Sequence, residues 1–229
     1  MTRFVKPIAL MLMALGLALV AIGGVNMIRA NEGLASLDAV YEAQGVELSY
    51  NEDGLLVDRG TTEGAESIMS LLVDDWKFPV NQAHFDAGDP LVNTPTELMY
   101  QYATITYHVL HGTQAVTLAD DVEFDGEVFP AGTYEFEVDG RYWTDFNRQH
   151  PIEGPARELA WGGAHGLLGS ISSGVAADYA AGFAHFAAWR TMLVGLAVLL
   201  GGVAVFGLAG READKILFVA SEEKEKVTA

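Results

Sequence analysis

The chain has 229 residues, of which half are hydrophobic, and it carries a formal net charge of −18 with a mean hydropathy of +0.20. This length allows one modest globular domain, and the hydropathy is high for a soluble protein. The acidic balance argues against a nucleic-acid partner, and the absence of cysteine excludes disulfide bonds and thiolate chemistry.

Two apolar runs, 8–28 and 192–209, hold most of the hydrophobic residues, and neither contains an ionisable side chain. The first would form a helix of roughly 32 Å, against a hydrocarbon core of about 30 Å. The second run is preceded by more apolar residues and by Trp189 and Arg190, which are typical of an interfacial anchor. The sequence predicts transmembrane helices at 8–29 and 189–210.

A cleaved signal peptide is the alternative interpretation of the first run. Arg3 and Lys6 precede it, and Arg29-Ala30 loosely imitates a cleavage site. The run is longer than the hydrophobic region of a signal peptide, which spans about 7–15 residues. We therefore expect it to be retained as an anchor.

Positive charge predicts the orientation of the two helices. Basic residues lie before the first run and after the second, so we expect 1–7 and 211–229 to be cytoplasmic, in the plasma membrane of the cell. The segment 30–188 would then be extracytoplasmic. It is strongly acidic, which predicts a solvated surface.

Local signals predict several elements before residue 112. Helical periodicity continues through 31–44 up to Gly45, a turn is expected at 51–54, and a short helix at 63–75 should end before Pro79. Thr94-Pro95-Thr96-Glu97 has the pattern of a capping box, which predicts a helix over 95–111. Its buried stripe is expected at Leu98, Tyr102, Ile105 and Val109.

From residue 114 to 143 the hydrophobic period changes to two, and Asp-Gly and Pro-Ala-Gly turns divide short strands. This pattern predicts a small antiparallel β-meander. Pro155 should open another helix, broken or bent around Gly162-Gly163. The predicted fold class is an α+β membrane protein, with two transmembrane helices flanking an extracytoplasmic domain that holds the meander and several helices.

Small residues are dense from Ser173 onward, and at helical spacing such a surface lets another helix approach closely. The first apolar helix, which carries Gly16, Gly23 and Gly24, is one candidate for that neighbour, and a helix of another subunit is the other. The residues predicted for helix packing or a partner interface are Gly174, Ala177, Ala181, Ala184 and Trp189.

Histidines and carboxylates invite a search for a metal site. His108 and His111 are three residues apart and would share a helix face, but zinc or iron needs a third ligand that no motif supplies. His185 lies nearly two helical turns after Asp178 and would suit a proton path as well as an interfacial position. We expect polar contacts at His108 and His111 rather than a metal.

An acidic cluster at 120–127 raises the question of calcium. An EF-hand loop requires oxygen ligands at fixed alternating positions and a glutamate at the twelfth. Here Phe124 and Val128 follow strand alternation, so calcium is an open alternative rather than a prediction. No nucleophile elbow, phosphate-binding loop or dinucleotide fingerprint occurs in the sequence.

The layout of span, acidic domain and span, together with the segments 100–102, 106–109, 132–134 and 142–146, resembles small actinobacterial two-span membrane proteins of unassigned role. That group is often labelled aromatic ring-opening dioxygenase. Such an enzyme needs histidines and a carboxylate on iron, and the sequence offers only His108 and His111. The chain is also similar in layout to accessory subunits of the cytochrome bcc–aa3 respiratory supercomplex.

That resemblance implies a non-catalytic, cofactor-free subunit that packs against larger integral membrane subunits and lipid, with its acidic domain over the electron-transfer face. A freestanding extracytoplasmic ligand-binding or sensor module is the alternative. An envelope enzyme with a metal near His108 and His111 comes third. The tail 211–229 is too short for a signalling domain, which counts against a sensor.

Overall fold

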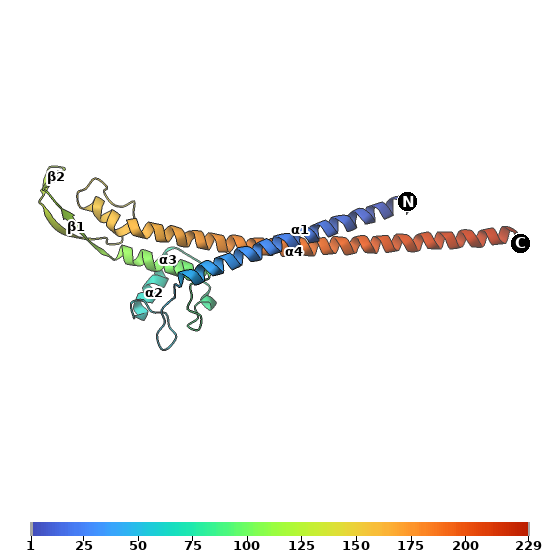
Figure 1. Cartoon of the computed structure of the whole chain (residues 1–229), viewed down its shortest axis with the longest axis horizontal. Coiled ribbons are helices and arrows are strands. Elements are labelled where there is room, and N and C mark those ends of the chain that lie inside the picture. The colour runs from blue at the N-terminus through green and yellow to red at the C-terminus, as the bar shows by residue number, and fades with distance from the viewer. Residues whose placement is uncertain (1, 229) are drawn as a thin grey trace. The chain divides into compact units, whose positions relative to one another are not determined.

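The computed structural model describes the backbone of residues 2–228 and the side chains of residues 4–211 and 215. Several basic side chains that predict the orientation, those of Arg3, Lys224 and Lys226, lie outside this described part. The elements in chain order are α1 (Thr2–Gln44), α2 (Thr62–Ser70), the π-helix η1 (Leu71–Asp75), the 3-10 helix η2 (Gln82–His84), α3 (Pro95–Leu110), β1 (Thr113–Leu118), β2 (Val122–Phe124), β3 (Glu127–Phe129), β4 (Gly132–Glu137) and α4 (Glu153–Thr228) (Figure 1).

The chain packs as two compact units. Met1–Ser36 with Ala180–Ala229 forms one, which we call the helix pair, and Leu37–Tyr179 forms the other, which we call the central domain. Two long apolar helices and small antiparallel strand pairs give the predicted α+β layout.

The two helices of the helix pair, α1 and α4, run antiparallel and meet along small residues. Cβ atoms built on Gly195 and Gly202 would lie 2.7 Å from the backbone nitrogen of Val20 and 2.9 Å from the carbonyl oxygen of Ala9. Real side chains do not fit at such distances, so the backbones are in direct contact. Of the two neighbours predicted for the small residues of α4, the first apolar helix of the same chain is therefore one.

These small residues recur at intervals of seven on both helices. Ala9, Gly16, Gly23 and Ala30 of α1 and Ala188, Gly195, Gly202 and Ala209 of α4 are all buried. A seven-residue repeat is that of a left-handed coiled coil, since it keeps one seam facing the partner helix. Small residues at the seam replace the usual large knobs and bring the axes closer.

The outward sides of the helix pair remain apolar. Phe4–Gln44 and Glu153–Arg211 are long enough and apolar enough to cross a membrane, and only 17% of the most apolar window in each is buried. A core helix of a soluble protein would be mostly buried instead. Their length and composition are therefore compatible with membrane localisation.

α1 ends where the sequence predicts. Gly45 adopts φ +58°, a left-handed conformation that favours glycine, and its backbone N–H donates to the Tyr41 carbonyl at 3.0 Å. The helix is continuous from Thr2 to Gln44, so the predicted extension of the apolar helix through 31–44 is confirmed.

α3 is the central element of the central domain, and its predicted capping box is present. Thr94 Oγ1 accepts from the backbone N–H of Glu97, whose carboxylate accepts in return from the backbone N–H of Thr94. The predicted buried stripe is only partly right, because of its four residues Leu98 alone is fully buried. Neighbours pack on more than one side of α3, so Tyr100, Ala103 and Thr106 are buried as well.

The predicted helix at 63–75 is present as α2 followed directly by η1. Pro79 does not end it. The chain leaves the helix after Asp75, and Lys77 adopts φ +55° before the proline is reached. The termination is therefore a backbone turn at Lys77 rather than the steric effect of proline.

The predicted meander is wrong in its pairing. β1 pairs with β4, with Val116 opposite Tyr134, and β2 pairs with β3, with Val122 opposite Phe129, so the strands form one hairpin nested inside another. The segment 141–143 is not a strand. The predicted packed face is confirmed at Val116, which contacts Ile152 and Ala156 at the start of α4.

α4 begins at Glu153 and is one continuous helix through Gly162-Gly163, so the helix is not broken there. Both glycines are exposed, and Trp161 and Ala164 on either side of them are buried in the core. Packing of these neighbours keeps the helix continuous through two residues whose own helix propensity is poor.

Candidate functional site

A hollow of the central domain lies between α3 and α4. It measures about 830 Å³, within the range of about 300–1,000 Å³ of small-molecule sites. We call it the aromatic cleft, and its lining residues are Trp76, Met99, Tyr102, Thr106, Tyr142, Trp143, Thr144, Trp161, His165, Leu168 and Ser172.

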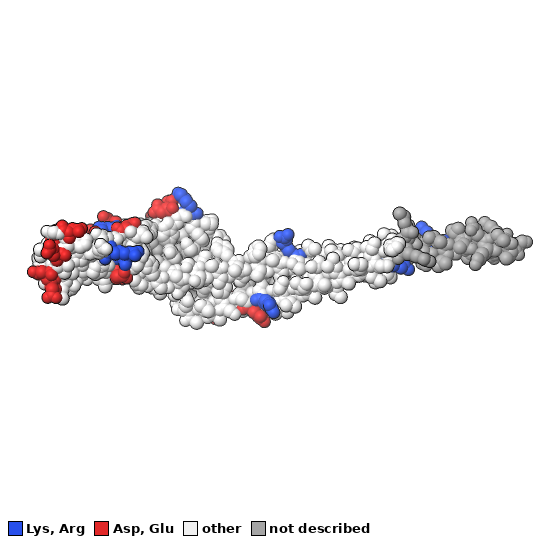
Figure 2. Space-filling model, turned by 90° about the horizontal axis from the view of Figure 1, so that it is seen from above, with Lys and Arg blue, Asp and Glu red and all other residues white. Residues whose placement is uncertain are grey.

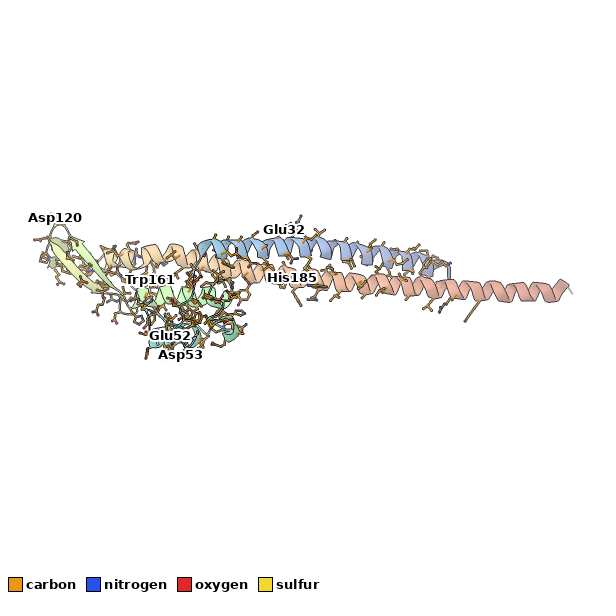
Figure 3. The ribbon with its side chains drawn as sticks, turned by 60° about the horizontal axis from the view of Figure 1, so that its bottom comes forward. Glu32, Glu52, Asp53, Asp120, Trp161 and His185 are labelled. Atoms are coloured by element: carbon orange, nitrogen blue, oxygen red, sulfur yellow. The ribbon has the colours of Figure 1, made fainter. Side chains whose placement is uncertain are left out.

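Four segments bring this lining together. Trp161, His165, Leu168 and Ser172 recur at three- and four-residue steps on α4, so they lie along one face of that helix. α3 supplies the facing wall with Met99, Tyr102 and Thr106, while Trp76 after η1 and the loop 142–144 complete the rim. Trp161 is labelled in Figure 3, at the start of α4.

The aromatic rings of the cleft contact one another. Trp76 and Tyr102 meet edge to face with centroids 5.6 Å apart, and Tyr142 stacks on Trp161 at 5.8 Å. The Trp76 indole N–H donates to the Tyr142 hydroxyl at 3.4 Å, a long bond across the rim. Such pairs add to burial in fixing ring orientation.

Arg157 supports the cleft from behind. Its guanidinium lies 3.8 Å from the ring centroid of Trp143, and the residue is 7% exposed. It pairs with Glu158, and its Nε and Nη1 atoms have no hydrogen-bond partner among the described residues. A cation against a ring face is attracted by the ring quadrupole, so Arg157 holds Trp143 in place.

One polar atom of the lining is unused. Thr106 is 2% exposed, and its hydroxyl has no hydrogen-bond partner among the described residues. Helical Thr hydroxyls usually bond to a carbonyl one turn back, as Thr104 does to Tyr100 at 2.9 Å. A buried hydroxyl without a partner costs free energy unless a water or ligand satisfies it.

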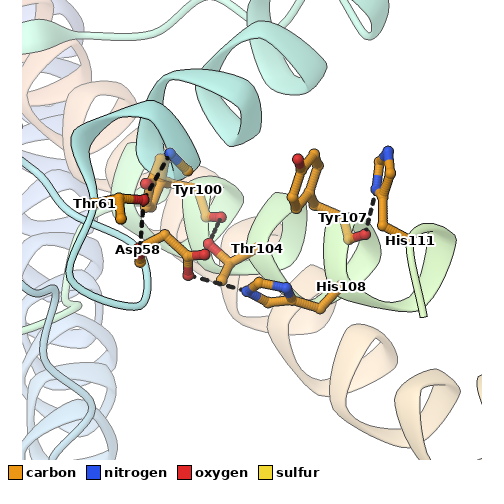
Figure 4. Close-up of polar contacts among 8 residues, drawn as sticks. Asp58, Thr61, Tyr100, Thr104, Tyr107, His108 and His111 are labelled. Atoms are coloured by element: carbon orange, nitrogen blue, oxygen red, sulfur yellow. Dashed lines mark hydrogen bonds and ion pairs between the residues drawn. The ribbon is translucent and has the colours of Figure 1, made fainter. Parts of the chain in front are cut away.

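His108 of α3 and His111, which follows the end of α3, do not form a pair. His108 Nε2 lies 3.0 Å from Asp58 Oδ1, and His111 Nδ1 lies 2.8 Å from the Tyr107 carbonyl oxygen (Figure 4). Each ring therefore has its own partner, which agrees with the expected polar contacts. Within the described residues no group of three or more histidines and carboxylates is placed to hold a metal ion.

Two tyrosine hydroxyls of the central domain, those of Tyr100 and Tyr50, are buried. Burial is the largest cause that raises the pKa of Tyr100, followed by the charge of Asp58, and burial also raises the pKa of Tyr50. Neither hydroxyl has a partner among the described residues. Both phenols are therefore held in the neutral form and are poorly suited to act as bases.

The acidic cluster at 120–127 forms the nested hairpin rather than a calcium loop. Asp125 and Gly126 adopt φ +51° and +83° at the turn between β2 and β3, and Asp121 accepts from the backbone N–H of Ala131 at 2.8 Å. Asp and Glu side chains gather over the strand region in Figure 2, whereas few charges lie over α1 and α4 of the helix pair.

The predicted interface residues fall in both units. In the central domain, a Cβ on Gly174 would lie 3.7 Å from the side chains of Tyr41 and Leu98, and Ala177 lines a second hollow beside it. In the helix pair, Ala181 and Ala184 line a shallow hollow of about 320 Å³. Trp189 is 48% exposed. Their role toward a partner stays a prediction.

Asp178 lies within the central domain near Tyr41 and Asp38. Burial is the largest cause that raises its pKa, Asp38 raises it further, and His84 opposes both. His185 belongs to the helix pair, where it is half-buried and labelled in Figure 3. The proton path between them remains a hypothesis.

The sequence reasoning did not identify the aromatic cleft. Its rings come from segments up to about ninety residues apart, so no local pattern joins them. A usable signal was present in the adjacent pair Tyr142-Trp143, and in Trp161 and His165, which lie four residues apart on one helix face.

A comparison of the chain with known protein families, curated proteins and solved structures finds no match.

Proposed function

We propose that the chain is a non-catalytic accessory subunit of a larger membrane protein complex, bound through its helix pair. The hollow of about 320 Å³ on that pair supports this proposal. It is lined by Asn26, Arg29, Ala30, Gly33, Ala181, Ala184, Ala187, Ala188 and Thr191. Two of these, Ala181 and Ala184, belong to the interface expected from the sequence.

The small residues of the hollow favour a helix as its occupant. Ala184 is exposed, and a Cβ on Gly33 would meet no atom within 4 Å. Small residues on a helix surface let another helix approach closely enough for direct backbone packing. A partner helix could approach here without displacing any large side chain.

The polar residues of the hollow favour a protein partner over lipid. Asn26 and Arg29 lie beside the small residues, and no ion pair of Arg29 is found within the described part of the chain. Polar side chains of membrane-spanning helices usually face other helices or pair with one another. A carboxylate or carbonyl on a neighbouring subunit would satisfy Arg29.

The resemblance in layout proposes which complex to examine first. In an actinobacterial cytochrome bcc–aa3 supercomplex, the helix pair would pack against larger integral subunits. The central domain, which has 25 acidic and five basic residues between Leu37 and Tyr179, would then face the extracytoplasmic electron-transfer surface.

Purification through a C-terminal tag in mild detergent tests this proposal. We expect large integral subunits to co-purify in fixed ratio, and haem bands in the visible spectrum would identify a respiratory complex. Ala184→Leu should abolish co-purification, because a larger side chain fills the hollow. Ala197→Leu is the matched control, since Ala197 is exposed on α4 outside the hollow. Normal assembly of the Ala184→Leu variant would contradict the proposed interface.

A further inference from the structure

We propose that the aromatic cleft of the central domain binds an uncharged saccharide. This inference is independent of the subunit role, because it concerns a hollow that lies wholly within Leu37–Tyr179. It rests on the size and charge of the cleft, on its rings, and on a hydroxyl group that has no partner among the described residues.

The lining selects against charged ligands. It contains no Lys, Arg, Asp or Glu, and His165 is its single titratable imidazole. An ion that leaves water for such a site would lose its hydration without gaining a counter-charge. The strong net acidity of the central domain would also repel an anion.

The rings of the rim provide flat, partly exposed surfaces. Tyr142 is 41% exposed, and Trp76 and Trp143 are half-buried, so each offers ring surface to the cleft while its other contacts hold it in place. The faces of aromatic rings are electron-rich. The C–H groups on one face of a pyranose carry slight positive charge, so a sugar ring stacks on such a surface.

The hydroxyls of the lining suit the other side of a sugar. Thr106 contributes a buried oxygen that has no partner among the described residues, while Thr144 and Ser172 contribute exposed hydroxyls near the rim. A purely apolar ligand would leave the Thr106 hydroxyl unsatisfied. The oxygen lies just below the floor of the cleft, so a small shift of the lining side chains would let a sugar hydroxyl accept or donate the missing bond.

A quaternary ammonium ligand fits less well. Rings alone would attract it by cation–π contact, but one face of Trp143 already carries the Arg157 guanidinium at 3.8 Å. No carboxylate lines the cleft to complete the recognition of a cation. The combination of ring faces with neutral hydroxyls therefore points to a saccharide.

Intrinsic fluorescence gives a direct measurement, because three of the four tryptophans line the cleft and the fourth, Trp189, lies in the helix pair. The full-length chain would be purified in a polyoxyethylene detergent, which carries no sugar head group. Maltotetraose, cellotetraose, chitotetraose and mannotetraose are the probes, with choline and menadione as competing chemistries.

We expect a saturable fluorescence change with at least one tetrasaccharide. Thr106→Val keeps the shape of the side chain and removes the hydroxyl, so it should weaken binding about tenfold. His165→Ala, at an exposed lining position, should also weaken binding, and it provides a second variant if Thr106→Val folds poorly. Trp189→Phe is the control and should leave the dissociation constant unchanged.

Several outcomes would overturn the proposal. No change with any of the four tetrasaccharides would do so, as would a dissociation constant that is the same in folded Thr106→Val and His165→Ala. Saturable binding of choline or menadione alone would assign the cleft to a different ligand class.

Discussion

The Glu97 carboxylate belongs to the N-terminal cap of α3 and is also buried in the central domain. Glu97 is 2% exposed, and its carboxylate accepts from the Thr94 hydroxyl at 2.8 Å and from the backbone N–H groups of Asn93 and Thr94. Hydrogen bonds to a charged group contribute about 1.5–3 kcal/mol each, and a lost cap costs about 1 kcal/mol.

We therefore predict that Glu97→Ala lowers the free energy of unfolding by about 2–3 kcal/mol, which is roughly a 5–10 °C fall in the melting temperature. Circular dichroism during heating in detergent measures the melting temperature. Glu66→Ala, at an exposed position of α2, is the control and should change little. Equal melting of the two variants would show that the buried cap does not stabilise α3.

Asp178 provides a prediction about pH. Burial, and then Asp38, raises the pKa of its carboxyl above the ordinary value of 3.8. The folded state therefore holds a proton that the unfolded state has already lost, and the stability falls as pH rises through this window. Asp178→Asn removes the charge, so it should raise the melting temperature at pH 7.

The gain should shrink as pH falls and vanish below about pH 3, where the carboxyl is protonated in both states. Melting curves of the wild type and of Asp178→Asn between pH 3 and 8 check this. Asp53→Asn, at an exposed turn, is the control. A loss of stability in Asp178→Asn at pH 7 would mean that the carboxylate is satisfied in the folded state.

At the scale of elements, the sequence predicted what local chemistry determines. The capping box of α3, the stop at Gly45 and the turn at Asp125-Gly126 each depend on a few adjacent residues. The pairing of β1 with β4 was missed. All four strands alternate apolar and polar residues in the same way, and that alternation fits pairing in sequence order as well as pairing in nested order. The continuity of α4 depends on packing that no glycine pattern reveals.

The seam of the helix pair leads to a prediction about side-chain size. Gly202→Leu should lower the melting temperature of the chain, because a Cβ at position 202 would lie 2.9 Å from the carbonyl oxygen of Ala9 and would force the two helices apart.

The matched control is Gly201→Leu, since a Cβ on Gly201 would meet no atom within 4 Å. Circular dichroism during heating in detergent measures both melting temperatures. Equal melting of the two variants would contradict the close contact of the backbones at the seam.

At the scale of the whole molecule, the two long apolar helices were predictable because their signal is a simple run of apolar residues. The aromatic cleft was not, since its lining is assembled by the packing of α3 on α4 and by two loops. The proposed partner surface could be predicted only in part, because it too is assembled from distant segments. The sequence predicted Ala181 and Ala184 by helical spacing, but Asn26 and Arg29 join them only across the helix pair.

The orientation of the chain is the last prediction. With two membrane spans, both ends should lie on one side, and the Lys and Arg residues near the ends predict that this side is the cytoplasm. A cysteine at Asp53, in an exposed turn of the central domain, should react with a membrane-impermeant maleimide on intact cells. A cysteine at Glu225 should react only after the membrane is permeabilised.

The intact mass of the purified chain separates an anchor from a cleaved signal. A retained first span gives about the full 24.6 kDa, whereas cleavage near Ala30 would remove the first helix of the pair together with its seam. Labelling of Glu225→Cys on intact cells would reverse the proposed orientation. A shortened chain would show that α4 must find its small-residue partner in another protein, because the seam at Gly195 and Gly202 cannot remain uncovered without losing its close packing.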